Sequence, residues 1–131
     1  MINIDIVVDN NLWKKKIKKI ELFFNTLIKF FPKKYKFIKK KVALTVLLSN
    51  NTNIKKLNKK FRNRNKATDI LSFPLEKKVN LKKNPYLGDI IISYQFMNKP
   101  KKLTNLEFKK KVAKIFIHGF LHLLGYDHIK L

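Results

Sequence analysis

The segment ATDILSFPLEKKVNLKKNPYLGDIIISY, residues 67–94, decides the fold because it contains two apolar strands in succession with no helix between them. Residues 67–74 end at a proline. Residues 88–94 begin with a glycine and contain three consecutive isoleucines. Both segments are typical of short strands. The polar residues between them show no apolar periodicity and predict a loop. A pair of this kind predicts a mixed sheet, because parallel neighbours need a longer crossover connection.

Two more strands and one long helix are predicted in the first third of the chain. Residues 2–8 alternate apolar and polar side chains, as a half-buried strand does, and residues 41–48 are an apolar run typical of a buried strand. Between them, apolar side chains recur every three or four positions from Trp13 to Phe31. This stripe predicts a single amphipathic helix that is capped at residues 9–11, ends at the next proline and packs on the core.

Two further helices complete the order of elements. A short helix is predicted from the spacing of Ile54, Leu57 and Phe61, with its cap near Asn51 or Thr52. The last helix begins with the S/T-x-x-E spacing of a capping box at Thr104 and Glu107. Its expected buried positions are Phe108, Val112, Ile115 and Phe116. The order βαβαββα predicts an α/β fold of the α+β type, with a roughly four-stranded mixed sheet in a single compact domain over residues 1–131.

The net charge of +23 is the strongest feature of the composition. Such an excess favours a nucleic-acid partner, because cations that neutralise phosphates release counterions. Only Arg62 and Arg64 are arginines, so the excess is almost all lysine, and an AT-biased genome would produce the same lysine-rich composition without selection for binding. Both explanations stay open on charge alone.

The sequence also limits the compartment and the classes of site. There are no cysteines, which excludes disulfides, thiolate zinc sites and cysteine nucleophiles. The N-terminal ten residues do not have the charge pattern of a signal peptide, and the longest apolar stretch is shorter than a membrane span. We therefore expect a cytoplasmic protein without a membrane partner; nothing in the sequence indicates its oligomeric state.

All three histidines lie within HGFLHLLGYDH, residues 118–128. His118 and His122 are four residues apart, so they share one face of the last helix and can bind one metal ion. On a continuous helix His128 would point elsewhere, so the chain must turn, and Gly125 stands where a glycine commonly ends a helix. This pattern predicts a metal site at the C-terminal end of the last long helix, with His118, His122 and His128 as ligands.

Three imidazole ligands favour one zinc ion, although copper, iron or nickel also accept them. Because three protein ligands leave one position for water, the site predicts a hydrolase that uses a zinc-bound hydroxide. The spacing also matches the metzincin proteases, H-E-x-x-H-x-x-G-x-x-H, but Gly119 stands where those enzymes have their general-base glutamate. A metzincin-like protease is therefore the least favoured alternative.

The same eleven residues closely resemble the HGxLHLxGYDH signature of the YbeY family, zinc-dependent endoribonucleases of ribosomal RNA maturation and ribosome quality control. LNKKFRNRNKATDILSFP, residues 57–74, is similar to the family's LN-x-x-[YF]-R…TDVLSFP block, and LGDIIIS, residues 87–93, to its LGDI-x-I-S strand. The resemblance extends from the second helix to the last histidine, over half of the chain. Members commonly continue beyond the last histidine with an acidic tail or helix, whereas three residues follow it here. If such a tail supports the third ligand, we expect lower zinc affinity or lower stability.

The resemblance implies a single-strand-type endoribonuclease, with ribosomal RNA and the small ribosomal subunit as expected partners. It makes the three histidines the zinc ligands and Arg62 a catalytic residue, whose charge suits a phosphorane-like transition state. Arg64 and Lys66 are candidate RNA-binding residues, and Asp127 is a candidate to orient a metal ligand or to cap the turn. Thr68, Asp69 and Ser72 are candidates to line the cleft, or they bond along the strand edge.

Two questions stay open at the level of the sequence. The nucleophile is either the zinc-bound hydroxide or the substrate's own 2′-OH, because no general base is evident. The rival function is a ribosome-associated assembly factor in which the zinc is mainly structural.

Overall fold

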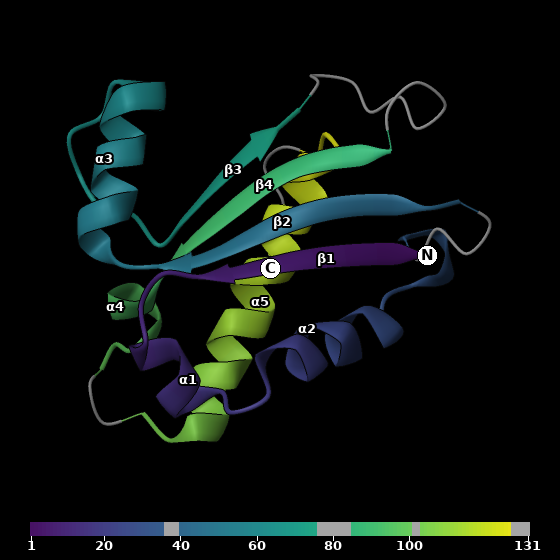
Figure 1. Cartoon of the computed structure of the whole chain (residues 1–131), viewed down its shortest axis with the longest axis horizontal. Helices are drawn as coiled ribbons and strands as arrows, with labels where there is room; N and C mark the ends of the chain where they lie inside the picture. Colours follow the sequence, from purple (N-terminus) through teal and green to yellow (C-terminus); the bar gives the residue numbers. More distant parts are fainter. Residues whose placement is uncertain (36–39, 76–84, 101–102, 127–131) are drawn as a thin grey trace.

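A computed structural model describes residues 1–35, 40–75, 85–100 and 103–126 of the chain. Its four strands form one sheet in the order β1-β2-β4-β3. β1 pairs with β2 and β2 with β4 in parallel, whereas β3 is antiparallel to β4 (Figure 1). The predicted mixed four-stranded sheet is therefore confirmed, and so is the α+β fold class. The strand bounds are Ile2–Val8 for β1, Val42–Ser49 for β2, Ile70–Pro74 for β3 and Tyr86–Ser93 for β4.

Helices cover the two faces of this sheet unequally (Figure 1). The larger core lies on one face, where α5 contacts β3 and β4, and α2 contacts β1. On the opposite face α3 packs over β3 and β4 around Ile54, Leu71 and Ile91. The helix bounds are Leu12–Lys16 for α1, Ile20–Lys29 for α2, Lys33–Tyr35 for the 3-10 turn η1, Asn51–Arg62 for α3, Tyr94–Met97 for α4 and Asn105–Leu123 for α5.

The prediction of one helix between Trp13 and Phe31 is wrong, because the chain breaks into α1 and α2. Ile17 adopts an extended backbone, with φ −127° and ψ 101°, yet its side chain stays buried. The break lets each half follow a different part of the core. Trp13 donates its indole N–H to the carbonyl of Ser49 at 2.9 Å, whereas Phe24 packs edge-on against Phe116 at 5.0 Å. The apolar stripe is thus buried as expected, on two helices.

Other differences from the predicted elements are small. The N-cap of α3 is Asn50, one residue earlier than expected, and its side chain accepts a hydrogen bond from the backbone of Asn53 at 2.9 Å. Phe61, one of the three apolar positions that predicted this helix, is 58% exposed. The short helix α4, which directly follows β4, was not predicted.

A β-bulge in β4 brings β3 close to its neighbour. Ala43 and Thr45 of β2 pair with Tyr86 and Asp89, so β4 holds one extra residue between them. Gly88 lies in this bulge with φ +139°. A Cβ atom on Gly88 would lie 2.2 Å from the carbonyl oxygen of Phe73. Only a glycine at this position therefore lets β3 approach as it does.

The helix that carries the histidines is well defined at both ends. At its start, Thr104 and Glu107 form the predicted capping box with bonds of 3.1 and 3.2 Å. At its end, Gly125 has φ +94°; its N–H donates to His122, and Tyr126 donates to Leu121, which is a Schellman motif. Phe108, Val112 and Phe116 are fully buried and Ile115 is partly buried. Within the described ranges, no helix has the length and apolarity needed to cross a membrane.

Candidate functional site

His118 and His122 lie side by side near the C-terminal end of α5. Their Nε2 atoms are 2.8 Å apart and their ring centroids 4.5 Å apart. Both side chains are partly buried, because α5 packs against β3 and β4 at this point. The four-residue spacing thus produces the proximity that the sequence predicts. This contact is a hydrogen bond between the two rings, and two imidazole nitrogens this close are a suitable start for a metal site.

The surroundings of His118 favour its neutral form. Burial lowers the pKa of His118, and the neighbouring His122 lowers it further, whereas the carboxylate of Asp69 acts in the opposite direction. A neutral imidazole has the free lone pair that a metal ion needs. The influence of Asp69 on this histidine was not evident from the sequence, because it depends on how β3 begins beside α5.

Arg62 faces the same cleft as the two histidines, although it comes from the end of α3. The cleft has a volume of about 380 Å³. The guanidinium of Arg62 donates to the carbonyl oxygen of Ser72 at 2.6 Å and lies 5.4 Å from the centre of the Phe73 ring. These two contacts hold a permanent positive charge at the edge of β3. The residues that line the cleft are Arg62, Ile70, Leu71, Ser72, Pro74, His118 and His122.

The other candidates from the sequence differ in their distance from this cleft. Ser72 lines it and donates to the carbonyl of Gly119 at 3.4 Å. Asp69 accepts hydrogen bonds from Thr68 and from the backbone of Ile70, at the start of β3. The described lining of the cleft includes neither Thr68 nor Asp69, and Asp69 acts on the site through its charge near His118.

Arg64 and Lys66 lie beyond the end of α3 and are exposed. Asn63 ends the helix in the left-handed conformation, with φ +56°. The side-chain amide of Asn58, in the same helix, donates to the carbonyl of Lys66 at 2.9 Å and fixes the path of the loop. A role for Arg64 and Lys66 in RNA binding stays a prediction.

The predicted third ligand, His128, and the adjacent Asp127 lie outside the described residues. Within the described ranges, no group of three or more His, Asp or Glu side chains is placed to hold a metal ion. The chemistry of the two histidines that are described nevertheless fits zinc. Two nitrogens on one tetrahedral zinc, each about 2.0–2.1 Å from it, lie about 3.3 Å apart, so the observed pair needs to open by only about 0.5 Å.

The structure gives Gly119 a packing role that the sequence did not reveal. This residue is buried, and a Cβ atom on it would lie 2.7 Å from Cδ1 of Ile70 and 3.1 Å from the hydroxyl of Ser72. The position after the first histidine therefore faces the sheet at close contact. A glutamate there, as in the metzincins, would require the Ile70 side chain to move.

Comparisons with known proteins identify relatives of this chain. The model of the YbeY family, described as Endoribonuclease YbeY, matches residues 7–131. The Endoribonuclease YbeY of Pelagibacter ubique is 72% identical over 131 residues, which are 100% of this chain and 86% of that protein. That of Ehrlichia ruminantium is 34% identical over 95% of this chain and 78% of its own length.

A solved structure shows the same fold. The solution structure of TM1509 from Thermotoga maritima superimposes with a TM-score of 0.57 and 30% identity, covering 98% of this chain and 75% of that one. The family model and the Pelagibacter protein both span residues 57–74, residues 87–93 and the histidine segment, residues 118–128. The chain therefore belongs to the YbeY family of endoribonucleases.

Proposed function

We propose that the protein hydrolyses RNA phosphodiesters with one zinc ion held by His118, His122 and His128, and with Arg62 as the catalytic cation. Endoribonuclease activity follows from the family. The observation that supports these roles is the pair of Nε2 atoms 2.8 Å apart in a cleft that Arg62 also lines.

Each group of the chain has a definite task in this proposal. When bound, zinc lowers the pKa of a water in its open coordination position to about 7 and so supplies a nucleophile near neutral pH. The lowered pKa of His118 keeps its imidazole neutral and able to bind the metal. Arg62, held in place by the carbonyl of Ser72, faces the site where negative charge grows on the phosphate and stabilises it.

The route of attack is tested by the ends of the products. Attack by the 2′-OH leaves a 2′,3′-cyclic phosphate, whereas attack by water leaves a simple phosphate. Mass spectrometry of short cleavage products distinguishes these ends. We expect a simple phosphate, and a terminal cyclic phosphate would exclude direct attack by water.

We further propose that the substrate is ribosomal RNA in the cytoplasm and that the protein meets it on the small ribosomal subunit. The net charge of +23 supports a polyanionic partner. Co-sedimentation with purified small subunits at increasing salt tests this partner. Binding must weaken steeply with salt if phosphate contacts dominate, and a lack of binding at low salt would exclude the subunit.

The decisive experiment compares the wild-type protein with His118→Ala, Arg62→Ala and Arg64→Ala on a structured RNA. Arg64 is the comparison for Arg62, because it is the other arginine of the chain and is exposed in the loop that follows α3; as a candidate RNA-binding residue it should affect RNA binding more than the chemical step. We expect His118→Ala and Arg62→Ala to lower the cleavage rate by about 100-fold or more, as the loss of a charge-stabilising group does, and Arg64→Ala to lower it much less. Equal cleavage by all four preparations would indicate a contaminating nuclease.

Metal content gives an independent readout. We expect one zinc per wild-type chain by elemental analysis and native mass spectrometry, full occupancy in Arg62→Ala, and reduced occupancy in His118→Ala. Wild-type protein without a stoichiometric transition metal would contradict the ligand assignment. If Arg62→Ala kept full activity while His118→Ala lost both metal and stability, the assembly-factor alternative with a structural zinc would be favoured.

A further inference from the structure

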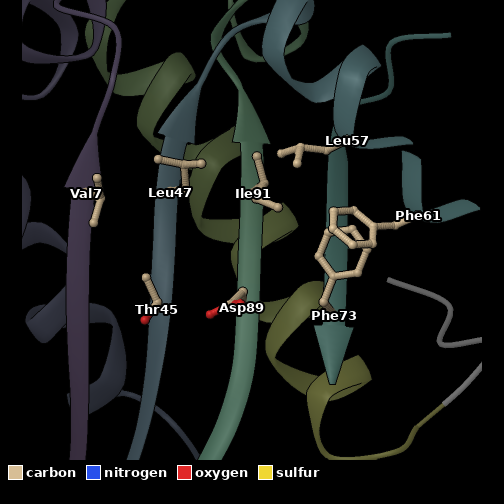
Figure 2. Close-up of a pocket in the computed structure, with 8 residues that line it drawn as sticks. All are labelled: Val7, Thr45, Leu47, Leu57, Phe61, Phe73, Asp89 and Ile91. Carbon is tan, nitrogen blue, oxygen red and sulfur yellow. The ribbon is translucent and has the colours of Figure 1, made fainter. Parts of the chain in front are cut away.

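A second concave surface lies on the face of the sheet opposite α5. It is an apolar groove of about 580 Å³, a size typical of ligand pockets. Residues of all four strands form its floor, and the C-terminal half of α3 forms one wall (Figure 2). Its lining residues are Val7, Thr45, Leu47, Leu57, Phe61, Phe73, Asp89 and Ile91.

Phe61 and Phe73 form an aromatic corner of this groove (Figure 2). Their ring centroids are 5.4 Å apart at an interplanar angle of 63°, so one ring meets the other edge-on. Phe61 is 58% exposed, although the next apolar position along this helix face, Leu57, is partly buried. A large exposed ring at the rim of an apolar groove is available to stack on a flat ligand.

The charges around the groove are separated in a way that suits a nucleotide. Lys60 lies with its Nζ 5.3 Å from the centre of the Phe61 ring, and the Arg62 guanidinium lies 5.4 Å from that of Phe73. The carboxylate in the groove is Asp89, which pairs with Phe73 across the strands. A phosphate is therefore attracted to the rim on α3 and repelled from the floor, whereas an uncharged base fits the apolar part.

Arg62 connects this groove with the histidine cleft. It lines the cleft, and its guanidinium also covers Phe73, which lines the groove. The two surfaces lie on opposite sides of the edge strand β3, whose side chains alternate between them: Ser72 and Pro74 line the cleft, and Phe73 lines the groove. An RNA strand that crosses this edge at Arg62 reaches both.

We propose that Phe61, together with Phe73 and Lys60, forms a stacking subsite for one unpaired base of the RNA, next to the nucleotide held at the histidine cleft. This inference rests on the proposed RNA cleavage and extends it, since it assigns the residues that hold a base beside the cut. The base stacks on the exposed face of Phe61, and its phosphate lies against Lys60 and Arg62.

The test measures binding rather than cleavage, so its failure is distinguishable from failure of the proposed reaction. Fluorescence anisotropy with a labelled single-stranded RNA compares wild type with Phe61→Ala and Phe30→Ala. Phe30 is the matched control, because it is an exposed phenylalanine, 83% accessible, at the end of α2. We expect Phe61→Ala to weaken binding about 5- to 100-fold, Phe30→Ala to weaken it less than about twofold, and binding of blunt duplex RNA to change equally little in both.

The variant Phe61→Trp supplies a direct signal and guards against misfolding. A tryptophan at this position keeps the stacking surface, and its fluorescence must fall when single-stranded RNA binds, while native Trp13 is fully buried and contributes a constant background. Thermal melting checks that all variants are folded. The subsite would be overturned by any of three results: unchanged binding by Phe61→Ala, an equal loss of binding with Phe30→Ala, or no quenching of Phe61→Trp. Unchanged RNA binding would point to a protein partner for the groove.

Discussion

Replacement of Gly88 by alanine tests how β3 is held against β4, and with it the position of one wall of the histidine cleft. Two features of the structure oppose a side chain here. The backbone of Gly88 has φ +139°, which residues with a Cβ rarely adopt. The new Cβ would also lie 2.2 Å from the backbone oxygen of Phe73 and 3.0 Å from Cα of Pro74. These are backbone atoms, so β3 itself must move.

The expected cost is the sum of a backbone term and a packing term. A non-glycine residue at positive φ costs about 1–2 kcal/mol, and overpacking of a closely packed site costs about 1–3 kcal/mol more. Gly88→Ala should therefore lower the free energy of unfolding by about 2–5 kcal/mol. Gly125→Ala separates the two terms, because Gly125 also has positive φ, +94°, but a Cβ there meets no atom of the described residues within 4 Å. Its expected cost is the backbone term alone, about 1–2 kcal/mol.

Urea denaturation followed by circular dichroism measures both variants against the wild type. Thermal melting should give the same order, with Tm lower by roughly 3–10 °C for Gly125→Ala and roughly 6–25 °C for Gly88→Ala. If the two alanine variants were equally stable, the close approach of β3 to the bulge would not limit stability, and the reasoning from the 2.2 Å contact would be refuted.

Three further predictions concern the helices that frame the site. Gly119→Ala gains about 1 kcal/mol of helix propensity but overpacks against the sheet by about 1–3 kcal/mol, so we expect no gain and up to about 2 kcal/mol of destabilisation in urea. Hydrogen bonds from Thr104 hold the pKa of Glu107 in the folded protein below its ordinary 4.5. The charged carboxylate therefore stabilises the folded protein fully above pH 4.5, and this stabilisation is lost as the pH falls through the lower pKa of the folded state. Glu107→Gln should remove this part of the acid dependence of Tm. Trp13→Phe removes the hydrogen bond to Ser49 and should cost about 1–3 kcal/mol in the same denaturation assay.

Most of the fold was predictable because each strand and helix depends on a pattern within its own short segment of the sequence. Residues 2–8 form β1 as predicted, and the capping box at Thr104 begins α5. The antiparallel pairing of β3 with β4 followed from the missing helix between them. The helix break at Ile17 was not predictable in this way, because its cause is the separate packing of α1 and α2 on partners distant in sequence.

The sheet order and the bulge also depend on contacts that a sequence pattern does not contain. Nothing in the run of isoleucines of β4 shows that β2 is one of its neighbours, or that Gly88 is an extra residue in the pairing. The glycine was visible in the sequence, but its function in the close approach of Phe73 becomes evident only when β3 is in place.

The candidate site shows the same division between local and distant information. His118, His122 and the turn at Gly125 are fixed by one helix and its end, so spacing alone placed them together. Arg62 is 56 residues before His118, and only its resemblance to a family block suggested a role. The packing of Gly119 was likewise hidden, because the atoms that exclude a side chain there belong to β3 and β4.

The edge strand β3 explains why these distant residues act together. Its carbonyl at Ser72 fixes Arg62, its Ile70 side chain meets α5 at Gly119, and its Phe73 side chain supports the opposite groove. A shift of β3 would therefore change the cleft and the groove at once. For this reason Gly88→Ala, which is remote from both histidines, should weaken RNA binding and cleavage together if the variant is folded, and Gly125→Ala should leave the binding of single-stranded RNA at Phe61 unchanged.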